Sequence, residues 1–271
     1  MTGSKQQEHR NRKRLLGSLF RDVFPFICLL VVLGWLFSHS LDNLGYNWQW
    51  YQVPPFIYSW TSEGFSPGPL LFGLGITLKI SAVSLVFAFL IGLVTAFLRL
   101  SRSPVARFIA RGYLETIRNT PLLIQIFFIY FVLGPALGLE RFPSAILALS
   151  LFEGAYASEI FRSGILSVDE GQLEAAKSLG LSKYHAYRFI ILPQAIRTIL
   201  PPLTSQAISL IKDSALVSTI AIYDLTMQAQ ALISETFLTF EIWFTVAILY
   251  LVITISLSLF VAFLERRLKL F

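Results

Sequence analysis

The sequence predicts an all-α integral membrane protein that crosses the bilayer six times. Hydrophobic residues make up 55% of the 271 residues and charged residues only 14%, whereas a soluble domain averages about 25% charged residues. Four stretches long enough for a bilayer core carry no charge. They are residues 23–41, 80–98, 121–139 and 242–264. Helices are expected because backbone groups in lipid must bond internally, and the weak alternation of a transmembrane barrel is missing.

Two further apolar stretches carry charges within them. Residues 142–161 contain Glu153 and Glu159, and residues 198–222 contain Lys212 and Asp213. We count both as spans, which gives six. The first span, residues 23–41, has a basic start, so a cleaved signal peptide is the alternative. Because no small-residue cleavage site follows it, we interpret it as an uncleaved anchor helix.

The net charge of +6 could indicate nucleic-acid binding. However, the basic residues are concentrated in every second segment between the predicted spans, which is the pattern of a membrane topology. Of the 22 lysines and arginines, 19 lie in residues 1–22, 99–118, 162–197 and the segment after residue 264. The segments between them, 42–75, 134–141 and 223–241, contain a single basic residue, Arg141. Positive charge marks the cytoplasmic side, so both termini are expected in the cytoplasm, and no nucleic-acid partner is predicted.

This topology divides the chain into a basic cytoplasmic N-terminus (residues 1–22), the first span (residues 23–41), a periplasmic aromatic segment (residues 42–69) and a five-helix domain (residues 70–268). The aromatic segment cannot be one helix, because Pro54-Pro55 interrupts it. Its tryptophans and tyrosines indicate a belt at the level of the lipid headgroups. A docking surface for an outside partner is the alternative.

No catalytic constellation is found in the sequence. Cys28 is the only cysteine and the three histidines are far apart, so neither a disulfide framework nor a metal site is predicted. There is no P-loop. We therefore expect a protein that is not itself an enzyme and holds no cofactor.

Residues 162–197 form the longest predicted cytoplasmic loop, and this loop is expected to be ordered. Residues 172–180 (QLEAAKSLG) favour a helix that ends at Gly180, with Asp169 and Glu170 at its start. Ser182 can cap a second helix over residues 183–191 that stops near Pro193. Two short helices joined by a glycine predict a compact surface for a soluble partner.

The spacing within this loop resembles the EAA-x3-G-x9-I-x-LP signature of ABC-importer permeases. The matching positions are Glu174, Ala175, Ala176, Gly180, Ile190, Leu192 and Pro193. Residues 118–125, 156–167 and 212–216 are similar to the polar amino-acid branch of that family. The resemblance covers roughly residues 68–268, so residues 1–67 are an addition to the family's five-helix core.

The resemblance implies a bacterial inner-membrane permease subunit of a type I importer for polar amino acids. It implies a cytoplasmic ABC ATPase dimer that docks on the loop and binds the ATP and Mg²⁺. A second permease subunit, identical or paralogous, and a periplasmic or lipid-anchored binding protein are also implied. In the family, small side chains at Ala175, Ala176 and Gly180 would let the loop seat closely, and Glu174 would pair with a basic group. The rival hypothesis is an ion-gradient-driven secondary transporter or channel, whose inverted repeats are not found.

Polar residues within the spans are candidates for the translocation path, because such residues are costly in a membrane and usually functional. Gln125, Glu153, Lys212 and Asp213 are expected to meet near the midplane. Either they contact the passing amino acid, or Lys212 pairs with an acid and only fixes the packing. Small residues are expected to pack the fourth span closely, and Glu159 and Arg162, at i and i+3, predict an interfacial ion pair.

Overall fold

The structure, a computed structural model, describes residues 23–36, 39, 45–61 and 64–268. The chain forms two units, Met1–Gln49 and Trp50–Phe271. In the first unit, the helix Val23–Leu36 exposes its apolar side chains, and the ring of Trp35 stacks on that of His39 with 5.5 Å between centroids. The helix covers the described part of the predicted first span. The predicted basic N-terminus lies outside the described residues.

The second unit begins with short elements in the aromatic segment. A 3-10 turn, η1 (Trp50–Gln52), precedes the one-turn helix α2 (Pro54–Ile57). The two prolines occupy the first helical positions, where a missing backbone N–H does no harm. Strands β1 (Tyr58–Thr61) and β2 (Gly64–Pro67) then form an antiparallel hairpin. Nothing in the sequence had led us to expect strands here.

Helix α3 (Pro69–Leu100) is the longest element and begins well before the predicted residue 80. Lys79 lies inside this helix, and its ammonium group lies 5.5 Å from the centroid of the Phe142 ring, in the predicted span 142–161. This cation–π contact provides an attractive environment for the charge within the helix.

Residues 122–137 of the predicted span 121–139 are helical without interruption. They comprise α5 (Leu122–Phe127), the π-helical segment η2 (Phe128–Leu133) and α6 (Gly134–Leu137). Helix α4 (Pro104–Arg118) precedes them where a loop was predicted, and it lies at 107° to the helix Leu122–Leu137. Pro121 is extended and starts α5, and Gly138, at φ 66°, ends α6, so local backbone constraints set both ends of this helical stretch.

Helix α7 (Arg141–Leu166) packs along α3 through small residues, as predicted. A Cβ atom on Gly92 of α3 would lie 2.8 Å from the Cβ of Ala157, and one on Gly154 would lie 2.9 Å from Ile91 Cγ2. Ser150 adds a hydrogen bond from its hydroxyl to the carbonyl oxygen of Ser84, 3.3 Å away. More of the most apolar stretch of α7 is buried than of α3 or α12, which makes α7 the central helix of this unit.

The remaining elements begin with α8 (Glu170–Ser178) and α9 (Lys183–Ala186), which continues through the π-helical segment η3 (Tyr187–Ile191) into α10 (Leu192–Asp213). The predicted stop near Pro193 is therefore wrong, because Pro193 lies in the first turn of α10 and needs no N–H partner there. Pro201 and Pro202 also lie inside α10.

Segment η4 (Ser214–Ile220), a 3-10 helix, ends at Ala221, whose φ of 56° is left-handed. Helices α11 (Leu225–Thr236) and α12 (Thr239–Leu268) complete the chain. Leu225 N–H donates to Thr77 Oγ1 at 3.1 Å, which joins α11 to α3.

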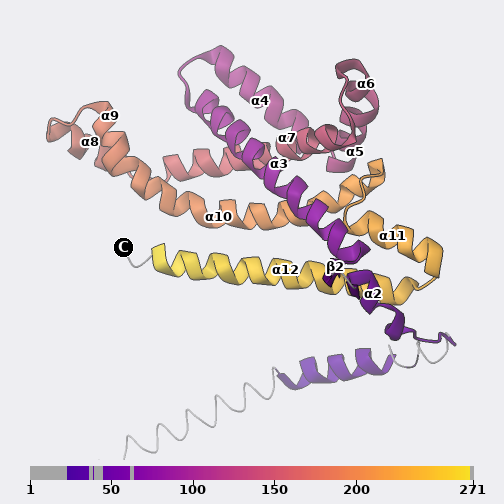
Figure 1. Ribbon diagram of the computed structural model, residues 1–271. Helices are drawn as coiled ribbons and strands as arrows, with labels where there is room; N and C mark the ends of the chain where they lie inside the picture. Colours follow the sequence, from indigo (N-terminus) through magenta and orange to yellow (C-terminus); the bar gives the residue numbers. More distant parts are fainter. Residues whose placement is uncertain (1–22, 37–38, 40–44, 62–63, 269–271) are drawn as a thin grey trace, which may run out of the picture. The chain divides into compact units, whose positions relative to one another are not determined.

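Within the described residues, three helices are long and apolar enough to cross a membrane: α3, α7 and α12. The number rises to five if each of the two bent pairs, α4 with α5–α6 and α9–η4 with α11, is one span. In Figure 1, α8 and α9 lie at the same end of this unit as the last turns of α12, whereas α6 and α11 lie at the opposite end.

Candidate coupling surface and translocation path

The first helix of the loop, α8, is fixed at both ends by its own sequence. At the start, the Asp169 carboxylate accepts a hydrogen bond from Gly171 N–H at 2.7 Å. At the end, Leu181 N–H donates to Ala176 O at 3.0 Å and Gly180 N–H donates to Lys177 O at 2.9 Å. These two bonds form a Schellman motif, which needs a residue with positive φ after the helix. Gly180 supplies it, with φ 75°.

The signature residues divide into exposed and buried ones. Glu174, Ala175 and Gly180 are exposed, whereas Ala176 is fully buried. The expectation that all the small residues of the motif face a partner is therefore wrong for Ala176. Its small side chain lets α8 pack against the rest of the loop from within. Towards the end of the motif, Ile190 is half-buried, and Leu192 and Pro193 are exposed.

Large apolar side chains outside the motif are also exposed on this loop. Leu179 is 79% exposed, Tyr184 68% and Phe189 63%. Ser182 caps α9 by accepting from His185 N–H, and the His185 ring stacks on that of Phe189 with centroids 5.9 Å apart. These three side chains are not part of the signature. Large apolar residues in an otherwise polar loop could still have indicated a contact surface from the sequence. Such a patch on an ordered loop is typical of a protein interface.

A pocket of about 650 Å³ separates α8 from the ends of the spanning helices. Phe97 of α3 and Ile165 of α7 line its wall, and Glu174, Lys177 and Tyr187 line the side formed by the loop. Residues of α3, α7 and the loop thus line one pocket.

Inside the spans, Glu153 is the centre of a polar cluster between α7 and α10. Its side chain is only 1% exposed, and its Oε2 accepts a hydrogen bond from Gln206 Nε2 at 2.5 Å. Its Oε1 is buried without a hydrogen-bond partner among the described residues, and the Asp213 carboxyl group lies close enough to act electrostatically on Glu153. A buried carboxylate oxygen without a partner, next to a second carboxyl group, favours a bound cation.

The other two predicted path residues do not join this cluster. Gln125 Nε2 donates to Ile117 O at 2.8 Å and to Thr120 O at 3.0 Å, so it holds the corner between α4 and α5. Lys212 is exposed and makes no ion pair within the described chain, although its charge acts on Asp213. The expected meeting of four residues is thus wrong, and only Glu153 and Asp213 come together.

Gln206 is not among the predicted path residues, yet it bonds directly to Glu153. Gln206 is seven residues before Asp213 on α10, a spacing that puts both on one face, and this signal is available in the sequence. Arg118, at the end of α4, places its guanidinium 5.9 Å from the ring centroid of Tyr156, one turn after Glu153 on α7. Arg118 therefore contacts α7 in the turn that follows Glu153.

The predicted ion pair between Glu159 and Arg162 is confirmed. Arg162 Nη2 lies 2.7 Å from Glu159 Oε1. The other oxygen of Glu159 binds Arg99 of α3, a partner that sequence spacing could not reveal. Glu159 therefore joins α7 to α3 near the loop.

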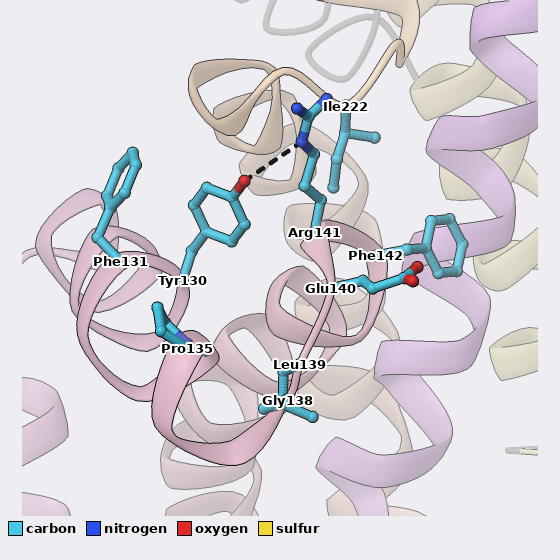
Figure 2. A pocket seen from close by; sticks show the side chains of 10 residues that line it. Tyr130, Phe131, Pro135, Gly138, Leu139, Glu140, Arg141, Phe142 and Ile222 are labelled. Carbon is cyan, nitrogen blue, oxygen red and sulfur yellow. Dashed lines mark hydrogen bonds between the residues drawn. The ribbon is translucent and has the colours of Figure 1, made fainter.

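A second cavity of about 650 Å³ lies beside the start of α7, at the end opposite to α8 and α9. Figure 2 shows Arg141 and Tyr130 pointing toward one another in it, with Ile222 nearby. Arg141 Nε donates to Tyr130 Oη at 3.3 Å, and Arg141 Nη1 donates to Ala221 O at 3.4 Å. Arg141, the one basic residue in the predicted outer segments, thus ties together η2, α7 and the turn after η4. No group of three potential metal ligands occurs among the described residues.

Comparison with known proteins identifies the family. Residues 88–270 match the family "Binding-protein-dependent transport system inner membrane component". The chain is 41% identical over 206 residues to the glutamine transport system permease protein GlnP of Escherichia coli K12, an alignment that covers 74% of this chain and 94% of that protein. It is 40% identical over 199 residues to the L-cystine transport system permease protein TcyB of Bacillus subtilis, covering 72% and 85%.

A solved structure agrees with this assignment. The crystal structure of an amino acid ABC transporter with histidines contains a chain that is 39% identical, with a TM-score of 0.69. The match covers 73% of this chain and 94% of that one. The protein therefore belongs to the binding-protein-dependent inner membrane components and is a permease subunit of an ATP-binding-cassette importer.

Proposed function

We propose that this permease subunit carries polar amino acids inward across the bacterial inner membrane as one half of a two-subunit pore. The observation that carries the proposal is the polar cluster between α7 and α10, in which the buried Glu153 meets the half-buried Gln206 and Asp213. Relatives at about 40% identity are named as glutamine and cystine permeases. A cargo of this class brings its own charges, which a buried polar cluster can bind.

The chemistry of a zwitterion suits the residues around this cluster. The carboxyl groups of Glu153 and Asp213 would bind the ammonium group, while the Gln206 amide holds the Glu153 carboxylate in place. Arg118, near Tyr156, would attract the carboxylate, and Lys212 would add positive charge beside Asp213. Gln125 would act from a distance, by fixing the corner between α4 and α5. A path with both signs of charge lowers the desolvation penalty for both ends of the amino acid.

The energy would come from a cytoplasmic ABC ATPase dimer that docks on α8 and α9. The exposed Leu179, Tyr184 and Phe189 offer an apolar contact surface, and exposed Glu174 would pair with a basic group of the ATPase. Ala175, Leu192 and Pro193 are exposed beside them, and Ile190 is half-buried. ATP and Mg²⁺ would bind to the ATPase, so this chain would need no cofactor.

The arrangement in the membrane would place both termini and the α8–α9 loop in the cytoplasm, with six spans in all. This assignment is supported by the basic residues near the loop and by the position of α8, α9 and the end of α12 on one side of the unit. Residues 1–22 would be a basic tail, 23–41 an anchor span, 42–69 a periplasmic segment and 70–268 the transport domain. A second permease, identical or paralogous, and a periplasmic or lipid-anchored binding protein would complete the importer.

Reconstitution tests this function directly. The full-length chain, purified with its ATPase and placed in vesicles with the binding protein, should show ATP hydrolysis that individual polar amino acids stimulate. Radiolabelled uptake of the same amino acids should follow. Stimulation only by sugars or metal ions would contradict the proposal, and uptake driven by an ion gradient without ATP would favour a secondary transporter.

A further inference from the structure

The β1–β2 hairpin sorts its side chains by chemistry onto two faces. The strands pair Tyr58 with Pro67 and Trp60 with Phe65, so these four residues share one face of the sheet. The pair Ser59 and Ser66 lies on the other face. The hairpin is therefore amphipathic, with an aromatic face and a hydroxyl face.

The burial of the two faces is the reverse of that in a hairpin of a soluble protein. Trp60 is 75% exposed, Phe65 57% and Tyr58 46%, whereas Ser59 and Ser66 are half-buried. In a soluble antiparallel sheet, the apolar face packs on the core and the polar face meets water. Here the Phe65 ring stacks on that of Tyr58, with centroids 6.4 Å apart, and meets the Trp60 ring edge-on at 6.0 Å. The exposed rings form one continuous aromatic surface.

Charge is almost absent from the sequence on either side of the hairpin. Between residues 45 and 78, Glu63 is the only charged residue. Interfaces with soluble proteins usually have a rim of polar and charged residues, whereas tryptophan and tyrosine gather where lipid headgroups meet the acyl chains. A tryptophan N–H and a tyrosine hydroxyl can bind water or headgroups there while their rings contact lipid.

The hairpin is also attached directly to a spanning helix. Gly68 N–H donates to Ile57 O at 2.8 Å, and Phe72 N–H donates to Gly68 O at 3.0 Å. A Cβ atom on Gly68 would lie 2.5 Å from the carbonyl of Phe56, so only glycine permits this approach of α2 to the start of α3. The exposed Phe72 on the first turn of α3 continues the apolar surface towards the helix.

We propose that the aromatic face of the hairpin, formed by Tyr58, Trp60 and Phe65, is seated in the headgroup layer of the outer leaflet. There it fixes the depth of the outer end of α3, to which Gly68 rigidly attaches it. We assign lipid to this face for two reasons. Charged residues are nearly missing from this part of the sequence, and the apolar surface continues onto the spanning helix α3. Half-burial of the serine face follows, because that face turns towards the protein.

Depth-dependent quenching of a single tryptophan tests the proposal. The full-length chain keeps Trp60 and carries phenylalanine at the other four tryptophan positions, in phosphatidylcholine vesicles brominated near the headgroup or near the chain ends. We expect shallow bromines to quench Trp60 about twofold more than deep bromines do. The matched control moves the tryptophan to the other face of the same strand, as Ser59→Trp with Trp60→Ser, and we expect lipid to quench it weakly.

Three results would overturn the proposal. Quenching of Trp60 by aqueous iodide, with no effect of brominated lipid, would place the surface in water. Protection from both quenchers would mean that protein covers it, and protection that appears only on addition of the binding protein would identify a docking surface instead. If the multiply substituted chain does not fold, the difference in quenching between the unaltered chain and Trp60→Phe measures the same quantity.

Discussion

The α8–α9 loop and the cluster around the buried Glu153 are two regions built in opposite ways. The loop is held by bonds between residues close in sequence, such as the cap of Asp169 and the Schellman motif at Gly180. The cluster exists only because α7 and α10 bring Glu153 and Gln206, distant in sequence, within 2.5 Å. The loop presents apolar side chains to the outside, whereas the cluster hides polar ones.

The difference has a functional consequence. A locally determined surface keeps its shape while it moves, which suits a part that receives force from a partner. A cluster assembled from two helices changes whenever those helices shift, which suits a part that must bind and then release a cargo. The pocket of about 650 Å³ beside α8 lies between the loop and the ends of α3 and α7. Helix α10 joins the two regions, from Leu192 at the loop to Asp213 at the cluster.

The largest effect is expected from Gly180→Asp in the loop. A Cβ at this position meets no atom within 4 Å, and aspartate is one of the residues that adopt the left-handed φ of 75°, so the fold and membrane insertion should survive with a small loss of stability. The new charge lies beside the exposed apolar surface, and uptake should fall to background while ATP hydrolysis no longer responds to the binding protein. Uptake in vesicles and co-purification of the ATPase measure the two effects.

Gly180→Asn is the matched control for this change. Asparagine has nearly the same shape as aspartate and also tolerates positive φ, but it carries no charge. It should retain most of the uptake. Normal uptake by Gly180→Asp would refute a coupling role for this surface.

The next largest effect is expected in the cluster, from Glu153→Gln and Lys212→Met. Loss of a charge-assisted hydrogen bond to the cargo is worth about 1.5–3 kcal/mol, so uptake by Glu153→Gln should fall roughly 10- to 100-fold. Hydrolysis stimulated by the binding protein should persist, because the loop is unchanged. A smaller loss is expected for the exposed Lys212. Unchanged uptake in both variants would remove these residues from the path.

A moderate effect is expected at the contact that lies between the two regions. A Cβ on Gly164 of α7 would lie 2.2 Å from Cγ1 of Ile199 on α10, so Gly164→Ala must push the helices apart. Overpacking of this kind costs about 1–3 kcal/mol, measured as a lower midpoint of thermal unfolding in detergent. Gly75→Ala, whose Cβ would meet nothing within 4 Å, should leave the midpoint unchanged. An equal drop in both variants would argue against the close contact.

The smallest effect is expected from Arg99→Ala. Glu159 would keep its bond to Arg162 at 2.7 Å, and a partly exposed ion pair is worth about 0.2–1 kcal/mol. The thermal midpoint should fall slightly, and more in low salt than in high salt, because salt screens the pair. A loss of uptake without a change in stability would instead assign Arg99 to coupling.

Much of the fold could be predicted because apolar runs and helix caps are local signals. The spans at α3, α7 and α12, the glycine at the end of α8 and the Glu159–Arg162 pair follow from residue type and spacing. Helix α4 and the bend after it were not predicted, because residues 104–118 carry several arginines and their charge indicated a loop. The hairpin was missed because its aromatic face points outward, against the pattern of a soluble strand.

The candidate site was predictable only in part, for a related reason. Glu153 and Asp213 could be identified because charged residues are rare in apolar spans. The uncharged Gln206 was not identified, although it shares a helix face with Asp213. Gln125 was predicted as a path residue because it is a polar residue in an apolar stretch. Its amide group instead donates hydrogen bonds to the carbonyl oxygens of Ile117 and Thr120. Which polar groups satisfy one another depends on how the helices pack, and no single stretch of sequence contains that information.

The separation of tasks between the loop and the cluster is tested most directly by measuring two activities on the same vesicles. Uptake of amino acid and hydrolysis stimulated by the binding protein are compared for Gly180→Asp and Glu153→Gln, each assembled with the ATPase. The account predicts that both variants lose uptake, and that Glu153→Gln alone keeps stimulated hydrolysis. Stimulated hydrolysis that survives in Gly180→Asp but is lost in Glu153→Gln would contradict it.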